Sequence, residues 1–268
     1  MSEDGLGRRG FLKSAGALLA GTSGASALRA KQIQKTHDGG NYTGIPEKYI
    51  DSPEFYNHLE QTYPDSDIQE FDSDDRNMIL DYHVIGDINH LEPTMTVVEN
   101  DFERMGIEVT SLLNPESYEL DQFMDDYGME ANNIVGGTEG VADAILGDNT
   151  QNFWYEQTDD VMKEAAIQVI YIQEPEGYEE GLEITHNSNS HSSTGVAIGD
   201  RASVFFNSLE DFEHRSSQFN LGISVTEHEI AHCLGVGHKE DTIMAPSIGS
   251  NRPSFDNEQI GTMVEQLS

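Results

Sequence analysis

The chain has little cysteine and little positive charge. Cys233 is the only cysteine among 268 residues, so no intramolecular disulfide can form. Lysine and arginine together number 14, against 49 aspartates and glutamates, which gives a formal net charge of -35. Phosphate groups repel a chain this acidic, so nucleic acid and anionic membrane surfaces are excluded as partners. No apolar run in the sequence reaches the length of a membrane span.

The excess of acidic residues allows two interpretations. One is a disordered, self-repelling chain, but aromatic residues make up 8% of the sequence and several runs are strongly apolar. The other is a folded protein with an acidic surface, because the Debye length falls to about 3 Å at molar ionic strength and self-repulsion is then screened. The composition resembles that of proteins from extreme halophiles. We therefore predict a folded, salt-adapted protein.

Residues 1–30 differ in composition from the rest of the chain. Arg8 and Arg9 open the sequence RRGFLK, and a mildly apolar run rich in glycine and alanine follows it. Small residues at Ala25–Ala27 then stand at the spacing that signal peptidase requires. This leader resembles a twin-arginine export signal; the alternative is a flexible basic terminus with a chance arginine pair. The resemblance implies export by the twin-arginine route to the cell surface or the medium.

The remaining chain divides into two parts by composition. Residues 31–76 are polar, acidic and rich in turn formers, and predict an amino-terminal extension or pro-segment with a short helix at Pro53–Gln61. Residues 77–268 have the apolar patterns of one globular domain. The strands expected there are Met78–Ile85, Ile107–Leu113, Ile167–Ile172, Thr194–Ile198 and Ala202–Phe206. The helices expected there are Pro93–Met105, Tyr118–Tyr127, Asp159–Glu164, a long helix reaching His232, and Asp256–Leu267. The predicted fold is α+β, with a twisted mixed five-stranded sheet.

The sequence HEIAHCLGVGH at residues 228–238 carries the strongest chemical signal. His228 and His232 are four residues apart, so a helix places both imidazoles on one face, where they can bind one zinc ion. Glu229 is adjacent to the first histidine and is positioned to act on water without being a ligand. Gly235 can end the helix with a positive φ, so the chain turns back and offers His238 as the third ligand. Three neutral imidazoles leave a fourth position open, which is typical of a catalytic zinc.

The other face of this helix is apolar. Ile230, Ala231 and Leu234 are expected to pack against the sheet, and Cys233 is expected to be a small core residue that points away from the metal. A pair of histidines in HExxH alone also fits an ordinary amphipathic helix. The glycine and the third histidine, each with a mechanical role of its own, favour the zinc site.

The pattern HExxHxxGxxH is identified as the zinc signature of the metzincin metalloproteases. Metzincins place a methionine turn below the metal, and Met244 in DTIMAP at 241–246 matches it, most closely in the form found in adamalysins. The closing helix after Asp256 resembles that of matrixin and other metzincin catalytic domains. Adamalysins and archaemetzincins carry cysteines in or around this region, whereas this chain has only Cys233. The resemblance therefore names the clan and leaves the branch unassigned.

This resemblance implies a zinc metalloendopeptidase acting on protein or peptide substrates, and we expect a monomer. One catalytic Zn²⁺ would be held by the three histidines, with Glu229 as general base, and the substrate would add as a strand to the edge at 194–198. Calcium is a possible second cation, but no EF-hand pattern supports it. His186, His191 and His214 are expected to be surface histidines. Asp241 is either an exposed turn carboxylate or the partner of a ligand.

Two other functions stay open at this point. One is a secreted acidic surface or adhesion protein that uses zinc only for structure. Glu229 argues against it, because a structural site has no need of that carboxylate. The other is a zinc hydrolase that cleaves a non-peptide bond, and only the metzincin resemblance weighs against it.

Overall fold

The computed structural model describes residues 42–72, 74–88, 91–127, 147, 149–173, 195–206, 215–245 and 254–268. The predictions for the leader at residues 1–30, for Thr194 and for Pro246 concern residues outside these ranges, as do those for His186, His191 and His214.

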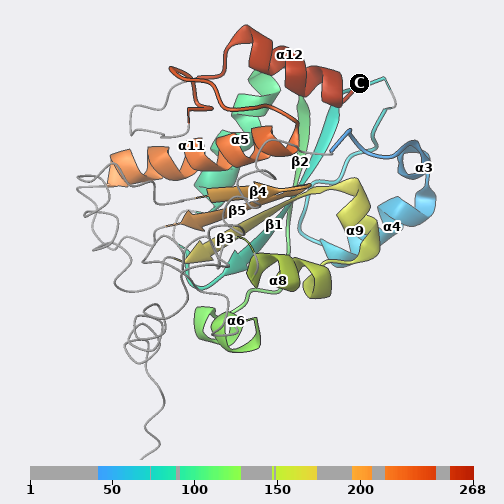
Figure 1. The fold of residues 1–268 in the computed structure, drawn as a ribbon. Helices are drawn as coiled ribbons and strands as arrows, with labels where there is room; N and C mark the ends of the chain where they lie inside the picture. Colours follow the sequence, from blue (N-terminus) through green and yellow to red (C-terminus); the bar gives the residue numbers. More distant parts are fainter. Residues whose placement is uncertain are drawn as a thin grey trace, which may run out of the picture.

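A five-stranded mixed sheet forms the centre of the described chain (Figure 1). Its strands are β1 Asn77–Ile85, β2 Glu108–Leu113, β3 Ile167–Gln173, β4 Gly195–Ile198 and β5 Arg201–Phe206. The strand order is β2-β1-β3-β5-β4, and every neighbouring pair is parallel except β4 with β5. The near-continuous burial of β1 and β3 is typical of parallel strands that are covered on both faces. A mixed five-stranded sheet is thus confirmed, with mostly parallel strands.

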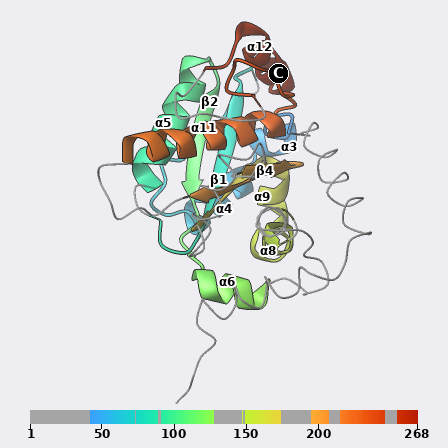
Figure 2. The ribbon, with the colours of Figure 1, turned by 60° about the vertical axis from the view of Figure 1, so that its left-hand side comes forward.

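Helices cover the two faces of this sheet (Figures 1 and 2). They are α3 Glu47–Ile50, α4 Pro53–Thr62, α5 Leu91–Arg104, α6 Leu120–Asp126, α8 Thr150–Gln157, α9 Asp160–Ala165, α11 Arg215–Cys233 and α12 Asn257–Gln266. Leu80 and Tyr82 share a core cluster with α5, α11 and α12, whereas Ile79 packs with α4 and α9. Successive residues of a strand point to opposite faces, so these contacts define three layers.

The hairpin of β4 and β5 forms one edge of the sheet in the described chain. Gly199 between the strands has a φ of +60°, which glycine adopts without steric cost and which fits the predicted turn. Val196 packs into the cluster that contains α6 and α8, and Ala197 packs into the cluster that contains α11. The short strand β4 therefore presents Gly195 and Ala197 on the face that α11 covers, and α11 contacts both strands of the hairpin.

The described part of the predicted amino-terminal extension packs against this domain. Phe55, Leu59 and Phe71 are buried in one cluster with residues of β1, β2 and α9. Tyr42 reaches the opposite cluster and donates a hydrogen bond from its hydroxyl to the carbonyl of Ala165 at 3.1 Å. Residues 42–72 thus supply core side chains among their many acidic residues. The division of the chain at residues 30 and 76 stays a prediction.

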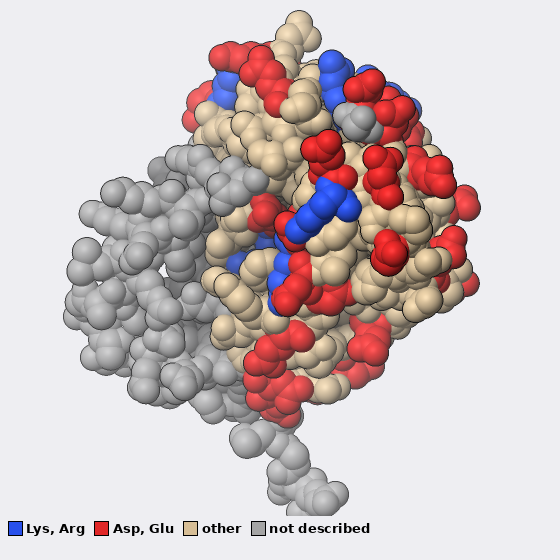
Figure 3. Space-filling view, turned by 90° about the vertical axis from the view of Figure 1, so that its right-hand side faces the viewer, with Lys and Arg blue, Asp and Glu red and all other residues tan. Residues whose placement is uncertain are grey.

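Carboxylates are spread over the surface of the described chain. On the face shown in Figure 3 they surround a few lysine and arginine side chains. Among the side chains whose burial is described, Tyr155, which is 61% exposed, is the one large hydrophobic side chain that is mostly accessible to solvent. None of the helices described is both long and apolar enough to cross a membrane.

Candidate metal centre

Helix α11 supplies the first half of the candidate site. His228 and His232 are buried one turn apart, with exposed fractions of 5% and 1%. Ile230, Ala231 and Leu234 pack into the core cluster between α11 and the sheet, as the amphipathic pattern predicts. This apolar anchorage holds the two imidazole rings in a defined orientation.

A glycine turn ends α11 and reverses the chain. Gly235 has a φ of +78°, its N–H donates to the carbonyl of His232 at 3.0 Å, and the N–H of Val236 donates to the carbonyl of Ala231 at 3.0 Å. These two bonds with a left-handed glycine constitute a Schellman motif. The motif delivers His238 to the two helical histidines, as the sequence predicts.

The Nε2 atoms of the three histidines converge on one point. His232 Nε2 lies 2.9 Å from His228 Nε2 and 3.1 Å from His238 Nε2, and the three possible ligand atoms lie within 4.8 Å of one another. Zinc–nitrogen bonds of about 2.0–2.1 Å in tetrahedral geometry separate two nitrogen ligands by about 3.3 Å. The triad therefore has the dimensions of a metal site.

The proton positions of the helical histidines also fit a metal ligand set. The Nδ1 of His228 lies 2.7 Å from the carbonyl oxygen of Ile243, and the Nδ1 of His232 lies 2.7 Å from that of Val236. A carbonyl can only accept, so each Nδ1 carries a proton, and in its neutral form each ring directs an Nε2 lone pair toward the other Nε2 atoms. A cation bound between Nε2 atoms 2.9 Å apart would accept these lone pairs. The residues present thus fit a divalent metal such as zinc.

The turn after His238 contacts the same site through a hydrogen bond to His228. Ile243 holds His228 through its carbonyl, and Met244 beside it is fully buried. The N–H of Lys239 donates to the carbonyl of Met244 at 2.9 Å and closes the loop. Met244 thus lies where a methionine turn requires it along the chain, and its role as the floor of the metal site stays a prediction. Asp241, with a φ of +62°, is an exposed turn carboxylate.

Glu229 is buried beside the edge strand. Its exposed fraction is 5%, and the backbone N–H of Ala197 donates a hydrogen bond to its carboxylate. The Oε2 atom is buried without a hydrogen-bond partner among the described residues. Burial raises the pKa of Glu229 to about 8, against the lowering effect of the Ala197 N–H. A carboxylate with one uncommitted oxygen and a raised pKa has the properties of a group that exchanges protons near neutral pH.

Cys233 is a core residue, as predicted. Its side chain is fully buried in the cluster between α11 and the sheet, and burial raises the pKa of its thiol well above the ordinary value. A thiol in this state is neither a metal ligand nor a nucleophile.

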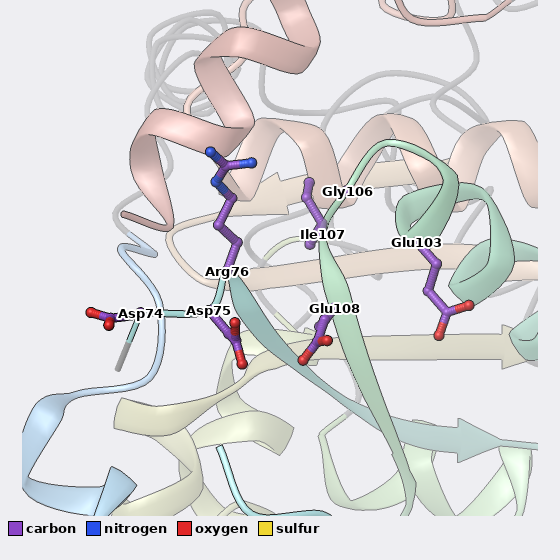
Figure 4. Close-up of a pocket in the computed structure, with 7 residues that line it drawn as sticks. All are labelled: Asp74, Asp75, Arg76, Glu103, Gly106, Ile107 and Glu108. Carbon is purple, nitrogen blue, oxygen red and sulfur yellow. The ribbon is translucent and has the colours of Figure 1, made fainter. Parts of the chain in front are cut away.

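A separate surface hollow of about 480 Å³ lies where β1 and β2 begin (Figure 4). It is lined by Asp74, Asp75, Arg76, Glu103, Gly106, Ile107 and Glu108. In Figure 4 the carboxylate of Asp74 points away from those of Asp75 and Glu108. It shares no residue with the histidine triad, and the single group of three or more potential metal ligands found in the described chain is that triad.

Two residues of β4 contact Glu229, a role that the sequence analysis did not predict for the edge at 194–198. Gly195 approaches Glu229 so closely that an added Cβ would lie 2.7 Å from its Oε1, and Ala197 provides the N–H that binds the carboxylate. The one available signal was the glycine at the start of a predicted strand, since glycine in a strand often marks a close approach of another group.

No protein-family model matches the chain, and no curated protein matches it. Among solved structures, a crystal structure of archaemetzincin from Methanopyrus kandleri is similar, with a TM-score of 0.46 and 15% sequence identity. The similarity covers 72% of this chain and 96% of the archaemetzincin chain.

Proposed function

We propose that the protein is a zinc-dependent metalloendopeptidase. The observation that carries this proposal is the convergence of three histidine Nε2 atoms, together with a buried glutamate that directly follows His228 and has one uncommitted oxygen. The helical pair and the glycine turn produce this arrangement from the HExxHxxGxxH pattern. His228, His232 and His238 would hold the zinc, which when bound supplies Lewis acidity to water and to the scissile carbonyl.

Glu229 is the proton carrier in the proposed reaction. Its carboxylate takes a proton from the attacking water and then donates it to the amine that leaves when the peptide bond breaks. Burial favours the protonated form of Glu229, and a nearby cation favours the ionised form. Because these two effects oppose each other, the carboxyl group of Glu229 can both accept and release a proton during the reaction.

The proposed substrate is a peptide in extended conformation. Strand β4 lies at an edge of the described sheet, and a peptide can pair with its outward backbone groups as an additional strand. Glu229 touches this same strand, so a peptide bound there passes close to the site. We further propose that the protein is exported through its twin-arginine leader, acts at the cell surface or outside the cell, and works in concentrated salt.

Replacing Glu229 by glutamine tests the proposal. The variant keeps the shape of the side chain and the oxygen that accepts from Ala197, so it should bind one zinc per chain. Its rate of casein digestion in molar salt should fall by about 10²–10⁴-fold, because the general base is lost. The exposed Glu265 provides a matched control, since Glu265→Gln makes the same chemical change at a surface position that is not part of the triad.

Three results would decide between the candidate functions. His232→Ala should lose both zinc and activity. A Glu229→Gln variant as active as the parent would refute the mechanism. A parent that binds zinc and cleaves no peptide would favour a structural zinc or a non-peptide substrate, and a panel of ester substrates would separate these two.

A further inference from the structure

The contact between Gly195 and Glu229 leaves no room for a side chain at position 195. A Cβ there would lie 2.7 Å from Glu229 Oε1 and 2.8 Å from Glu229 Cγ. It would also lie 2.6 Å from Val225 Cγ1 on the preceding turn of α11. Such separations are well inside van der Waals contact, so any larger residue must displace its neighbours. Two of its three nearest neighbours belong to Glu229.

Strand β4 holds the same carboxylate at a second point. The backbone N–H of Ala197 donates to it, and Ala197 lies on the same face of the strand as Gly195 because residues two apart share a face. Glu229 Oε2 is left buried and without a hydrogen-bond partner among the described residues. The strand thus constrains the carboxylate and leaves one oxygen for a non-protein group.

We propose that Gly195 and the Ala197 N–H are positioning elements for Glu229: the missing side chain admits the carboxylate against β4, and the amide orients it. The inference rests on the proposed function and adds to it. The strand proposed to bind the peptide also fixes the general base. The distance between them is then set by the direct contact of Glu229 on α11 with strand β4.

The first test measures the Ala197 amide directly and does not depend on enzymatic activity. In the metal-free protein, hydrogen exchange of the Ala197 amide is followed by NMR. Donation to a buried carboxylate should slow this exchange by about tenfold or more relative to Glu229→Ala, because exchange requires the bond to open. Gly195→Ala should speed it similarly. Equal exchange in the parent and both variants would overturn the proposal.

The second test measures turnover with zinc content as the check on the fold. Gly195→Ala should bind one zinc per chain and lose about 10–100-fold in kcat with KM little changed, since a displacement of about 1 Å in a catalytic group can cost 10²-fold. Gly261→Ala is the matched control, because nothing lies within 4 Å of a Cβ built at Gly261. Loss of zinc from Gly195→Ala would overturn the proposal. So would a rise in KM at unchanged kcat, which would assign the glycine to substrate approach.

A substitution at Val225 distinguishes the effect of crowding Val225 from the effect of crowding Glu229. If the defect arises from crowding Val225, removing that side chain in Val225→Ala/Gly195→Ala should restore the rate of Val225→Ala, and the proposal would be wrong. The proposal expects the double variant to stay about 10–100-fold slower. If the parent binds zinc but hydrolyses nothing, the proposed function fails, while the Ala197 exchange still decides whether β4 holds Glu229.

Discussion

The cluster around Leu59 shows whether the amino-terminal segment is part of the fold. Leu59 lies on α4, within residues 31–76, and its side chain is fully buried. It packs in one cluster with Phe55 of the same helix and with Ile79 and Leu112 of the sheet. The last two are also fully buried, and removing the segment would expose them to water. A removable pro-segment and an integral helix therefore predict different effects of Leu59→Ala.

The expected loss of stability follows from this environment. Leucine-to-alanine changes in protein cores cost about 2.7–5 kcal/mol, with the larger values where the cavity cannot collapse. Ile79 and Leu112 are held by strand pairing on β1 and β2, so one wall of the cavity is rigid. The other wall is the short helix α4, which can move inward. We expect a loss of about 3 kcal/mol in the free energy of unfolding.

Urea unfolding in molar potassium chloride measures this loss, with the neighbouring exposed Glu60 as control. Glu60→Ala should change the free energy of unfolding by no more than about 0.5 kcal/mol, because it removes a surface side chain. If Leu59→Ala and Glu60→Ala have the same midpoint, α4 does not belong to the cooperative unit. The reasoning would then be refuted, and the pro-segment interpretation would stand.

Two other predictions concern pH and salt. Burial lowers the pKa of His83, but the charge and hydrogen bond of Asp81 and the hydrogen bond of Gln168 outweigh it, so the folded pKa lies above 6.5. The stability that protonated His83 contributes is therefore complete below pH 6.5 and is lost as the pH rises through the folded pKa. The urea concentration at the unfolding midpoint should fall between these two pH values. His83→Gln should make this fall smaller. Screening of a net charge of -35 should raise the melting temperature between 0.1 M and 2 M potassium chloride, and a constant or lower value would contradict an adaptation to salt.

The sheet and most helices could be predicted because their apolar residues follow regular periods. β3 is a mostly apolar, buried run, and α5 repeats buried residues four positions apart, at Thr94, Val98 and Phe102. Helix α8 was not predicted, because only Thr150 and Phe153 of its eight residues are buried and the rest give no period. The packing of residues 42–72 was missed for a related reason. Their buried residues are widely spaced in an acidic sequence, and their partners lie far along the chain.

The candidate site also contains some features that could be predicted from the sequence and others that could not. The helical histidines, the Schellman turn and His238 lie within eleven residues, and the local geometry of a helix and a glycine turn is enough to place them. The bonds from Nδ1 to the carbonyls of Val236 and Ile243 were not predicted, because they depend on backbone positions after the helix. Gly195 lies 34 residues before Glu229, and no local period connects a strand residue with a residue on a helix that crosses it.

Salt is expected to act differently on the surface carboxylates and on the buried Glu229. Surface carboxylates are surrounded by solvent, so salt screens their mutual repulsion within a few ångströms. Glu229 is 5% exposed and lies between α11 and β4, where mobile ions have little access. Its protonation is set by burial, by the Ala197 N–H and by any cation held in the triad. We therefore expect salt to change the stability of the fold, and we expect the contacts of α11 with β4 to determine the properties of Glu229.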